Sequence, residues 1–242
     1  MNGPVFYTAG HTEALKYTVK NLQQQGFIFA SHPDHAVTHI LLGVPAGPIE
    51  DFKQILPQFS NDVAVLGGNL DFPELSSYHR IDLLKDPLYL AQNANITAYC
   101  AIKQAINRLP VILDRCPVLV IGWGRIGKCL ATLLKQMGAI VTVAARKETD
   151  RAAVASLGYE AEDSTALGYS LIRYRAIFNT VPTMVLPKEA IEFCHKDCLK
   201  IDLASKPGID AEDVIWARGL PSKDAPESSG TLIANTILRL IR

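Results

Sequence analysis

The sequence predicts an α/β fold with two lobes, each built around a parallel sheet. Short apolar segments alternate with helical stretches in both halves of the chain, and one long helical stretch separates the two series. The chain has 242 residues, 48% of them hydrophobic, so it can bury a sizeable core. We expect the smaller lobe to comprise residues 1–90 with a C-terminal helix over 228–242, and the second lobe to comprise residues 91–227.

The first lobe is expected to be a flavodoxin-like α/β domain. Its expected strands are VFYTAG, FIFA, THILLGVP and VAVLGG, and its expected helices are TEALKYTVKNLQQQG and DFKQILPQF. The first of these helices spans roughly residues 12–25 and stops at Gly26, because glycine readily takes the conformation that ends a helix.

The long helix is predicted over LYLAQNANITAYCAIKQAINRL, and Leu109-Pro110 ends it. The second series follows, with VLVIG as strand, RIGKCLATLLKQMG as helix, AIVTVAA as strand and RAAVASLG as helix. YRAIFNT, CLKIDLA and DVIWARG are the later expected strands. The chain closes with the helix SSGTLIANTILRLIR, for which Ser228 and Ser229 are candidate caps.

Charge and composition exclude several classes of protein. Lys and Arg together number 24, as do Asp and Glu, so no overall field attracts nucleic acid or an anionic membrane. No apolar run reaches the ~18 to 20 residues of a spanning helix, and the start lacks a secretory pattern. Five cysteines do not make a disulfide framework. We expect a cytoplasmic protein with reduced thiols and no nucleic-acid or membrane partner.

The stretch PVLVIGWGRIGKCLATLLKQMG carries a glycine fingerprint. Gly122, Gly124 and Gly127 fit G-x-G-x-x-G between an apolar strand and an amphipathic helix. They permit, in order, a tight turn, close approach of a pyrophosphate and close packing of helix on strand. This context predicts a Rossmann domain whose helix N-terminus faces the cofactor phosphates. The expected phosphate-loop residues are Gly122, Trp123, Gly124, Arg125, Ile126 and Gly127.

The end of the next strand indicates which dinucleotide is bound. An NAD site has Asp or Glu about 20 residues after the glycines, to accept from the ribose 2′-hydroxyl. Here Ala145, Arg146 and Lys147 stand in that region. Because Arg146 offers a guanidinium to a 2′-phosphate, NADP is favoured over NAD. The alternative is a solvated basic turn.

Three further loops follow the later strands, where open α/β sheets bind ligands. The first two are expected to flank the ribose and nicotinamide, and the third, residues 219–226, to face the cleft between the lobes. Turn chemistry alone would also explain their proline and glycine content. The expected cofactor contacts are Asn179, Thr180, Val181, Pro182, Leu203, Ala204 and Ser205.

With these residues in place, the second half of the chain resembles the A-subunit family of dipicolinate synthase, a family of oxidoreductases. The resemblance rests on four blocks in matching order and spacing: IGWGRIGKCLATLLKQMGAIVTVAAR, FNTVPTMVL, IDLASKPG and GLPSKDAPESSGTLIANTIL. It implies an architecture similar to D-2-hydroxyacid dehydrogenases, with the last helix returning to the first lobe. It also implies NADP-dependent oxidation of a dihydrodipicolinate-type intermediate to dipicolinate in sporulation, alongside a second, flavoprotein-like subunit. The chain is also expected to form a homo-oligomer.

The first half departs from the family pattern. It is shorter, and its first strand leads into TAGHTE where the family has a Gly-Gly-Asp turn. At the head of the long helix the family reads like Pro-Thr-x-Glu-Gly, whereas this chain has Thr97 but carries Tyr99 at the acidic position. A related protein with another substrate is therefore an alternative.

The reaction that the resemblance implies removes a hydride and a ring proton while the protein holds two carboxylates. The dicarboxylate is expected between the lobes. Thr97 and Lys206 are the catalytic candidates, Thr97 as a proton relay, although a solvated loop lysine is the alternative for Lys206. The expected substrate-binding residues are Lys206, Pro221, Ser222, Lys223 and Ser229.

Two other functions are alternatives to this one. Reduction of a 2-oxo acid would need a His–carboxylate pair and an Arg at the corresponding loops, and the sequence offers no such set. A non-catalytic NADP-binding protein is the second alternative. Cys194 and Cys198 lack a second ligand pair, so no metal site is expected. His11 and His79 are more readily explained as surface or packing residues.

Overall fold

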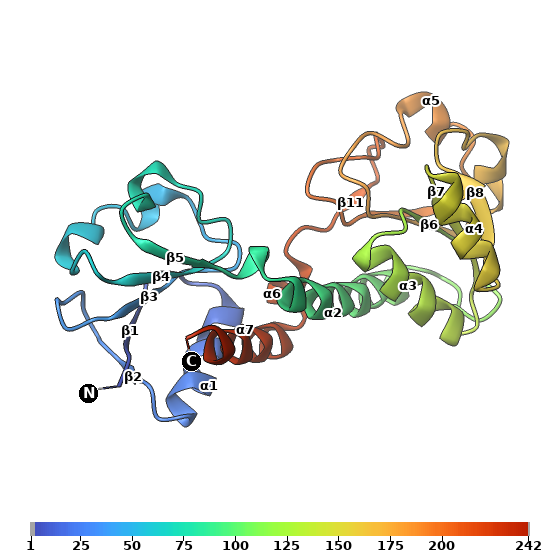
Figure 1. Cartoon of the computed structure of the whole chain (residues 1–242). Coiled ribbons are helices and arrows are strands. Elements are labelled where there is room, and N and C mark those ends of the chain that lie inside the picture. The colour runs from blue at the N-terminus through green and yellow to red at the C-terminus, as the bar shows by residue number, and fades with distance from the viewer. Residues whose placement is uncertain (1–2, 242) are drawn as a thin grey trace. The chain divides into compact units, whose positions relative to one another are not determined.

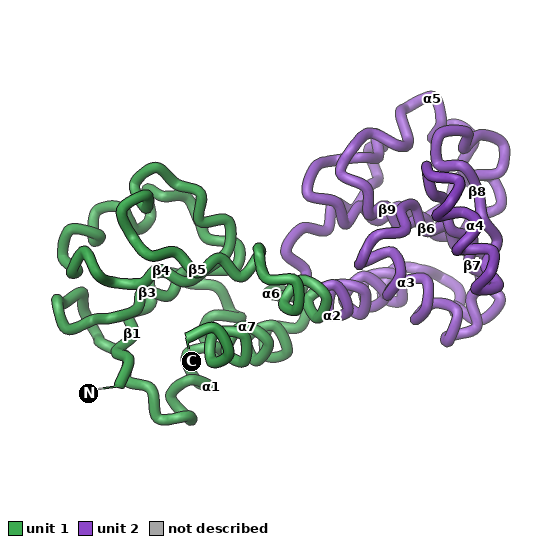
Figure 2. Tube along the Cα trace, viewed as in Figure 1, with its two compact units in different colours: residues 1–93, 221–242 green, residues 94–220 purple. Residues whose placement is uncertain are grey.

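The structure is a computed structural model that describes residues 3–241, and it divides the chain into two compact units (Figure 2). Unit 1 comprises Met1–Asn93 and Pro221–Arg242, and unit 2 comprises Ala94–Leu220. Residues 1, 2 and 242, which the sequence analysis assigned to the first lobe, lie outside the described residues. Residues 91–93 and 221–227 fall in unit 1, although they were expected in the second lobe.

Unit 1 contains a five-stranded parallel sheet in the order β2-β1-β3-β4-β5 (Figure 1). This is the flavodoxin-like strand order, and it confirms the fold predicted for this lobe. The strand β5 was not expected, because its sequence HRID is polar and half exposed. The strands are β1 Val5–Thr8, β2 Ile28–Phe29, β3 His39–Leu41, β4 Ala64–Gly67 and β5 His79–Asp82.

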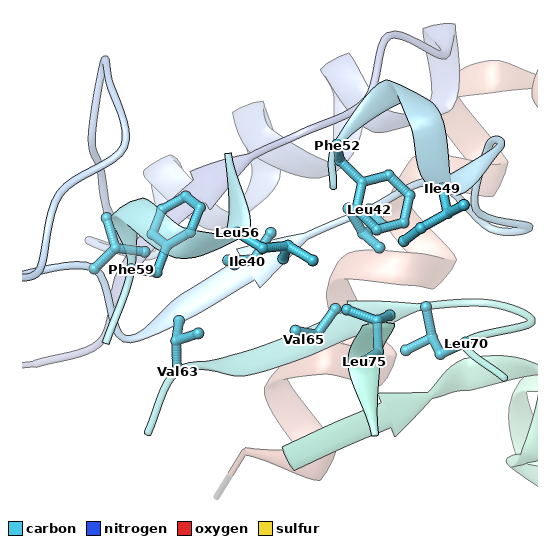
Figure 3. Close-up of a cluster of buried hydrophobic side chains, with 11 residues drawn as sticks. Ile40, Leu42, Ile49, Phe52, Leu56, Phe59, Val63, Val65, Leu70 and Leu75 are labelled. Carbon is cyan, nitrogen blue, oxygen red and sulfur yellow. The ribbon is translucent and has the colours of Figure 1, made fainter. Parts of the chain in front are cut away.

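Short 3₁₀ turns replace a helix that the sequence analysis expected in unit 1. The segment DFKQILPQF forms parts of η1 (Ile49–Asp51) and η2 (Leu56–Gln58), with turns between and around them. The prediction of a helix was wrong because Pro57 lacks the N–H that would continue one. The apolar residues still reach the core: Phe52 and Leu56 pack with Ile40 and Val65 of the sheet (Figure 3).

Helices α1 (Glu13–Gln24) and α7 (Pro226–Leu240) pack side by side in unit 1. Thr18 Oγ1 donates to the Gly230 carbonyl at 3.2 Å, and Asn21 Nδ2 donates to Thr231 Oγ1 at 3.0 Å. Arg239 forms an ion pair with Asp86 at 2.6 Å. These contacts tie the C-terminal helix to the first part of the chain.

The cap that was expected for this helix was wrong. Ser228 and Ser229 were the candidate caps, but α7 begins at Pro226, and Ala225 is the N-cap with no side-chain bond. Proline suits the first helical turn because it needs no N–H partner there. The amide of Ser229 donates to the Ala225 carbonyl at 3.0 Å, so this serine lies inside the helix.

Unit 2 contains a six-stranded parallel sheet in the order β11-β10-β9-β6-β7-β8. Counted from β6 as the first strand, this is the Rossmann order 6-5-4-1-2-3, as the glycine fingerprint predicted. The edge strand β8 was missed because its sequence, EAED, is largely acidic. The strands are β6 Pro117–Ile121, β7 Ile140–Ala145, β8 Glu160–Asp163, β9 Ala176–Asn179, β10 Leu199–Asp202 and β11 Ile215–Trp216.

Three helices in the middle of the chain lie close to where the sequence predicted them. The expected long helix is present as α2, Pro87–Ile106, and ends before Leu109-Pro110. Two helices follow β6 and β7, and short turns connect the later strands. They are α3 Arg125–Gln136, α4 Glu148–Ser156, η5 Tyr169–Arg173 and α5 Lys188–Ile191. Among residues 3–241, no helix combines the length and apolarity that crossing a bilayer requires.

The contact between α1 and α7 yields a prediction about stability. A side chain at Gly230 would collide with the carbonyl of Ala14 and the backbone of Thr18, so Gly230→Ala should force the helices apart. We expect a loss of about 1–3 kcal/mol and faster hydrogen exchange of amides in α1 and α7. Gly3→Ala is the control, since nothing lies within 4 Å of its side-chain position. Equal protection of α1 in the two variants would contradict the prediction.

Candidate functional site

The turn after β6 carries the three glycines, and each meets a different constraint. Gly122 has φ +105°, and a side chain there would collide with Thr180 and Val181 after β9. Gly127 lies against the Gly122 carbonyl, so a side chain would displace backbone. Nothing lies within 4 Å of the side-chain position of Gly124. Packing therefore explains two of the glycines, and open space at the third suits a ligand that approaches the backbone closely.

The N-terminus of α3 stands directly behind this turn. Gly124 is its N-cap and offers no side-chain bond, and its first turn holds no acidic residue. The first amides therefore keep a positive partial charge that attracts an anionic group such as a pyrophosphate. Thr180 Oγ1 donates to the Ile121 carbonyl at 2.9 Å and fixes the neighbouring turn after β9 beside the glycines.

A cavity of about 650 Å³ opens at the carboxyl ends of β6, β7, β8 and β9. It lies next to the point where the strand order reverses, which is where open α/β sheets bind ligands. Of the residues expected to bind a cofactor, seven line it: Gly122, Trp123, Ala145, Arg146, Lys147, Val181 and Pro182. Seven further lining residues were not expected: Ala144, Asp150, Ser164, Thr165, Thr183, Met184 and Val185.

The charged side chains of this cavity come from the turn after β7 and the start of α4. Arg146 and Lys147 are exposed after β7, and Asp150 in the first turn of α4 is half-buried. Two cations face one carboxylate, so this end attracts anions within a chain of zero net charge. The sequence alone does not place Asp150 in the cavity wall, because its position depends on how the start of α4 is oriented at the end of β7.

An aromatic contact lies beside the glycine turn: the Trp123 ring packs edge-on against the ring of Tyr159, with 6.0 Å between the ring centroids.

A buried carboxylate holds two of the expected cofactor loops together. Asp202, 1% exposed, accepts from Asn179 Nδ2 at 2.9 Å, the Ala204 amide at 3.0 Å and the Gly208 amide at 2.7 Å. Asn179 is fully buried and also exchanges hydrogen bonds with the backbone of Val181. Asn179 therefore does not line the cavity; it fixes the loops after β9 and β10. Asp202 begins the second of the loops expected at the ribose and nicotinamide, but its role in holding the two loops together was not predicted.

The other expected cofactor residues lie at the same edge of the sheet but outside the cavity lining. Arg125 and Ser205 are exposed, Ile126 is half-buried, and Leu203 and Ala204 are buried. The Ala204 carbonyl accepts from Trp216 Nε1 at 3.1 Å, which gives this loop a second anchor.

The expected substrate and catalytic residues are distributed over both units. In unit 2, Thr97 is buried on α2 and Lys206 is exposed after β10. The loop expected over 219–226 is mostly a short helix, α6 Leu220–Asp224, whose residues Pro221, Ser222 and Lys223 belong to unit 1. Ser229 is buried in α7, so its side chain is a packing group in unit 1. Tyr99 is 57% exposed on α2.

The two cysteines that the sequence offers as metal ligands form a pair with each other. A hydrogen bond between the thiols lowers the pKa of Cys194 and raises the pKa of the buried Cys198. Beside them, Lys200 Nζ donates to the Cys198 carbonyl at 2.9 Å and to Asp213 at 2.8 Å. Within the described residues, no three His, Cys, Asp or Glu side chains gather as a metal site would need.

Comparison with known proteins finds a relative in sequence. No protein-family profile matches the chain. The chain is 27% identical to the A-subunit of dipicolinate synthase of Bacillus subtilis (strain 168) over 157 residues, which are 62% of this chain and 53% of that protein. The matched region thus spans about half the length of this curated relative.

Solved structures extend the likeness in fold. The dipicolinate synthase A-subunit from Bacillus halodurans superposes with a TM-score of 0.84 at 21% identity, covering 98% of this chain and 96% of that one. Its counterpart from Bacillus subtilis gives 0.81 at 20% identity, covering 100% and 96%. D-lactate dehydrogenase from Escherichia coli gives 0.60 at 15% identity, covering 98% and 96%. At these identities the structures show the fold alone, and together with the sequence match they confirm the resemblance.

The Asp202 network predicts a specific loss of stability. Asp202→Asn places an amide donor where three N–H groups converge, so at least one buried donor loses its acceptor. We expect unit 2 to lose about 3 kcal/mol in urea unfolding. Asp210→Asn is the control, because Asp210 is exposed in the same loop region and its change should stay within about 0.5 kcal/mol. Similar losses in the two variants would count against the network.

Proposed function

We propose that this chain, which resembles the A-subunit of dipicolinate synthase, is an NADP-dependent oxidoreductase that converts a dihydrodipicolinate-type intermediate to dipicolinate. The observation that carries the proposal is the cavity at the glycine turn, since its walls are the parts of a Rossmann sheet that hold a dinucleotide. The five free cysteines are consistent with action in the reducing cytoplasm.

The cofactor would lie with its pyrophosphate over Gly124 and the N-terminus of α3. The open space at Gly124 and the uncapped helix start support this placement. The adenosine ribose would then face the turn after β7, where Arg146 and Lys147 can neutralise a 2′-phosphate. Asp150 in the same cavity favours NAD instead, because its carboxylate could accept from a ribose hydroxyl. Two cations against one carboxylate support NADP as the preferred form.

The bound dinucleotide would supply the hydride acceptor, and aromatisation of the ring would drive the reaction. The protein must hold the two substrate carboxylates and direct the departing ring proton to an acceptor. Exposed Lys206 and Lys223 are the proposed cationic ligands, together with Ser222. Thr97 remains the proposed proton relay, although its burial means that neighbouring side chains must move for a ligand to reach it.

A binding protein without catalysis is the second candidate. The observation that favours it is exposed Tyr99, which stands on α2 where the family that the chain resembles carries an acidic residue. If that acid serves the chemistry, cofactor binding would persist here without turnover.

The proposed oxidoreductase would form a homo-oligomer and work with a second, flavoprotein-like subunit, so its activity is best measured with that partner present.

The first test concerns the cofactor. Calorimetric titration should give tighter binding of NADPH than of NADH, because Arg146 pairs with the 2′-phosphate. Arg146→Ala should reduce the preference about tenfold, the loss of one charge-assisted bond. Asp150→Asn should strengthen NADPH binding, since it removes a negative charge from the cavity. Lys188→Ala, on exposed α5 outside the cavity, is the control. Equal affinities in the unmutated protein would contradict the assignment of NADP.

The second test concerns the reaction. Purified protein, NADP and freshly generated dihydrodipicolinate should give pyridine absorbance and NADPH in equal amounts, with the flavoprotein-like partner present. Gly124→Ala is the control variant: its side chain meets nothing within 4 Å, so folding should persist while the dinucleotide is blocked. Rates at the uncatalysed background with the partner present would reject the reaction and leave the binding protein as the conclusion.

A further inference from the structure

The turn after β7 is held in place by an arginine that does not line the cavity. Arg151, at the first turns of α4, points Nη1 back at this turn. It donates to the Ala145 carbonyl at 3.0 Å and to the Arg146 carbonyl at 2.7 Å. The same nitrogen lies 3.1 Å from Asp163 Oδ2 at the end of β8. One guanidinium group therefore joins two neighbouring turns at the edge of the sheet.

Asp163 is itself fixed in its charged form. Its Oδ1 accepts from the amide of Thr165 at 2.9 Å and from the hydroxyl of Thr165 at 2.7 Å. These bonds hold the pKa of Asp163 below its ordinary value. A backbone bond joins the same two turns: the Ser164 amide donates to the Ala145 carbonyl at 3.4 Å. The turn after β8 is thus bonded to the turn after β7, and Arg151 is the charged group that contacts both turns.

Both joined turns line the cavity, although Arg151 and Asp163 do not. Arg146 and Lys147 come from the turn after β7, and Ser164 and Thr165 come from the turn after β8. The side chain of Arg151 is 24% exposed and that of its carboxylate partner 37%, so water screens the pair less than it screens a fully exposed one. A turn whose carbonyls are fixed presents Arg146 from one backbone conformation, and less entropy is then lost when a ligand binds.

We infer that Arg151 is a positioning residue for cofactor selection: through the Ala145 and Arg146 carbonyls and Asp163, it fixes the turn that presents Arg146 to the 2′-phosphate of NADP. This inference rests on the proposed binding of NADP. Arg151 acts on the phosphate through Arg146, because Arg146 lines the cavity whereas Arg151 does not, and Nη1 of Arg151 is bonded to the two carbonyls behind Arg146.

A double-mutant cycle with two adenosine probes tests the inference. Adenosine 2′,5′-bisphosphate carries the 2′-phosphate, AMP lacks it, and the ratio of their dissociation constants isolates the recognition of that group. The ratio is measured by calorimetry on the full chain and on the variants Arg146→Ala, Arg151→Ala and the double variant. We expect Arg151→Ala to reduce the preference about fivefold in the unmutated background and less than about twofold in the Arg146→Ala background.

Two further variants separate positioning from general loss of structure. Arg151→Lys keeps a cation near the carbonyls but not the planar group, so it should recover part of the preference. Arg173→Ala removes another arginine that pairs with β8, through Glu162, without reaching the turn after β7, so the ratio should not change. If Arg151→Ala does not fold, Asp163→Asn is used instead. It removes the carboxylate charge that pairs with Arg151, so it should also lower the preference for the probe with the 2′-phosphate.

Three outcomes would overturn the inference. In the first, Arg151→Ala lowers the preference for the 2′-phosphate by the same factor whether or not Arg146 is present. Arg151 would then act on the phosphate by itself. Another is an equal weakening of both probes. The third is that the unmutated protein binds the two probes equally, or binds neither; the assignment of NADP then fails and the inference fails with it.

Discussion

Gly127 in α3 lies so close to the carbonyl of Gly122 that no side chain fits between them. The helix therefore starts directly behind the end of β6, and its first amides face the edge of the sheet. Thr180 locks the neighbouring turn after β9 to the same strand end. The cavity is the space that this arrangement leaves open, so its position is fixed by backbone packing before any ligand is considered.

Charged side chains also hold the loops at that edge, beside an apolar cluster that includes Ile121, Ala144 and Val181. On one side of the point where the strand order reverses, buried Asp202 gathers donors from two loops. On the other side, Arg151 gathers acceptors from the turn after β7 and the end of β8. In each case one charged group bonds to two backbone groups of these loops. Loops fixed in this way can present ligand-binding groups with little rearrangement.

The sequence predicted what local pattern determines, and failed where tertiary contacts decide. Strand β6, helix α3 and the glycine turn follow from apolar periodicity and spacing, so both the fold and the position of the cavity were within reach. Strands β5 and β8 lie at sheet edges and are polar, so no apolar pattern marks them. The supporting role of Asn179 and the presence of Asp150 and Thr165 in the cavity wall depend on how loops from different strands meet, which spacing alone does not reveal.

Unit 1 is discontinuous in the chain, and this has a consequence for its biogenesis. Helix α1 is synthesised early, but the Gly230 carbonyl that accepts from Thr18 lies 212 residues later. Unit 2 is made without interruption in between and can complete its sheet during translation. Until α7 emerges, the face of α1 that carries Ala14, Tyr17 and Thr18 lacks the cover that Gly230 and the rest of α7 provide, so a nascent chain exposes this face. A ribosome-associated chaperone that shields such surfaces would therefore aid the folding of the first unit more than that of the second.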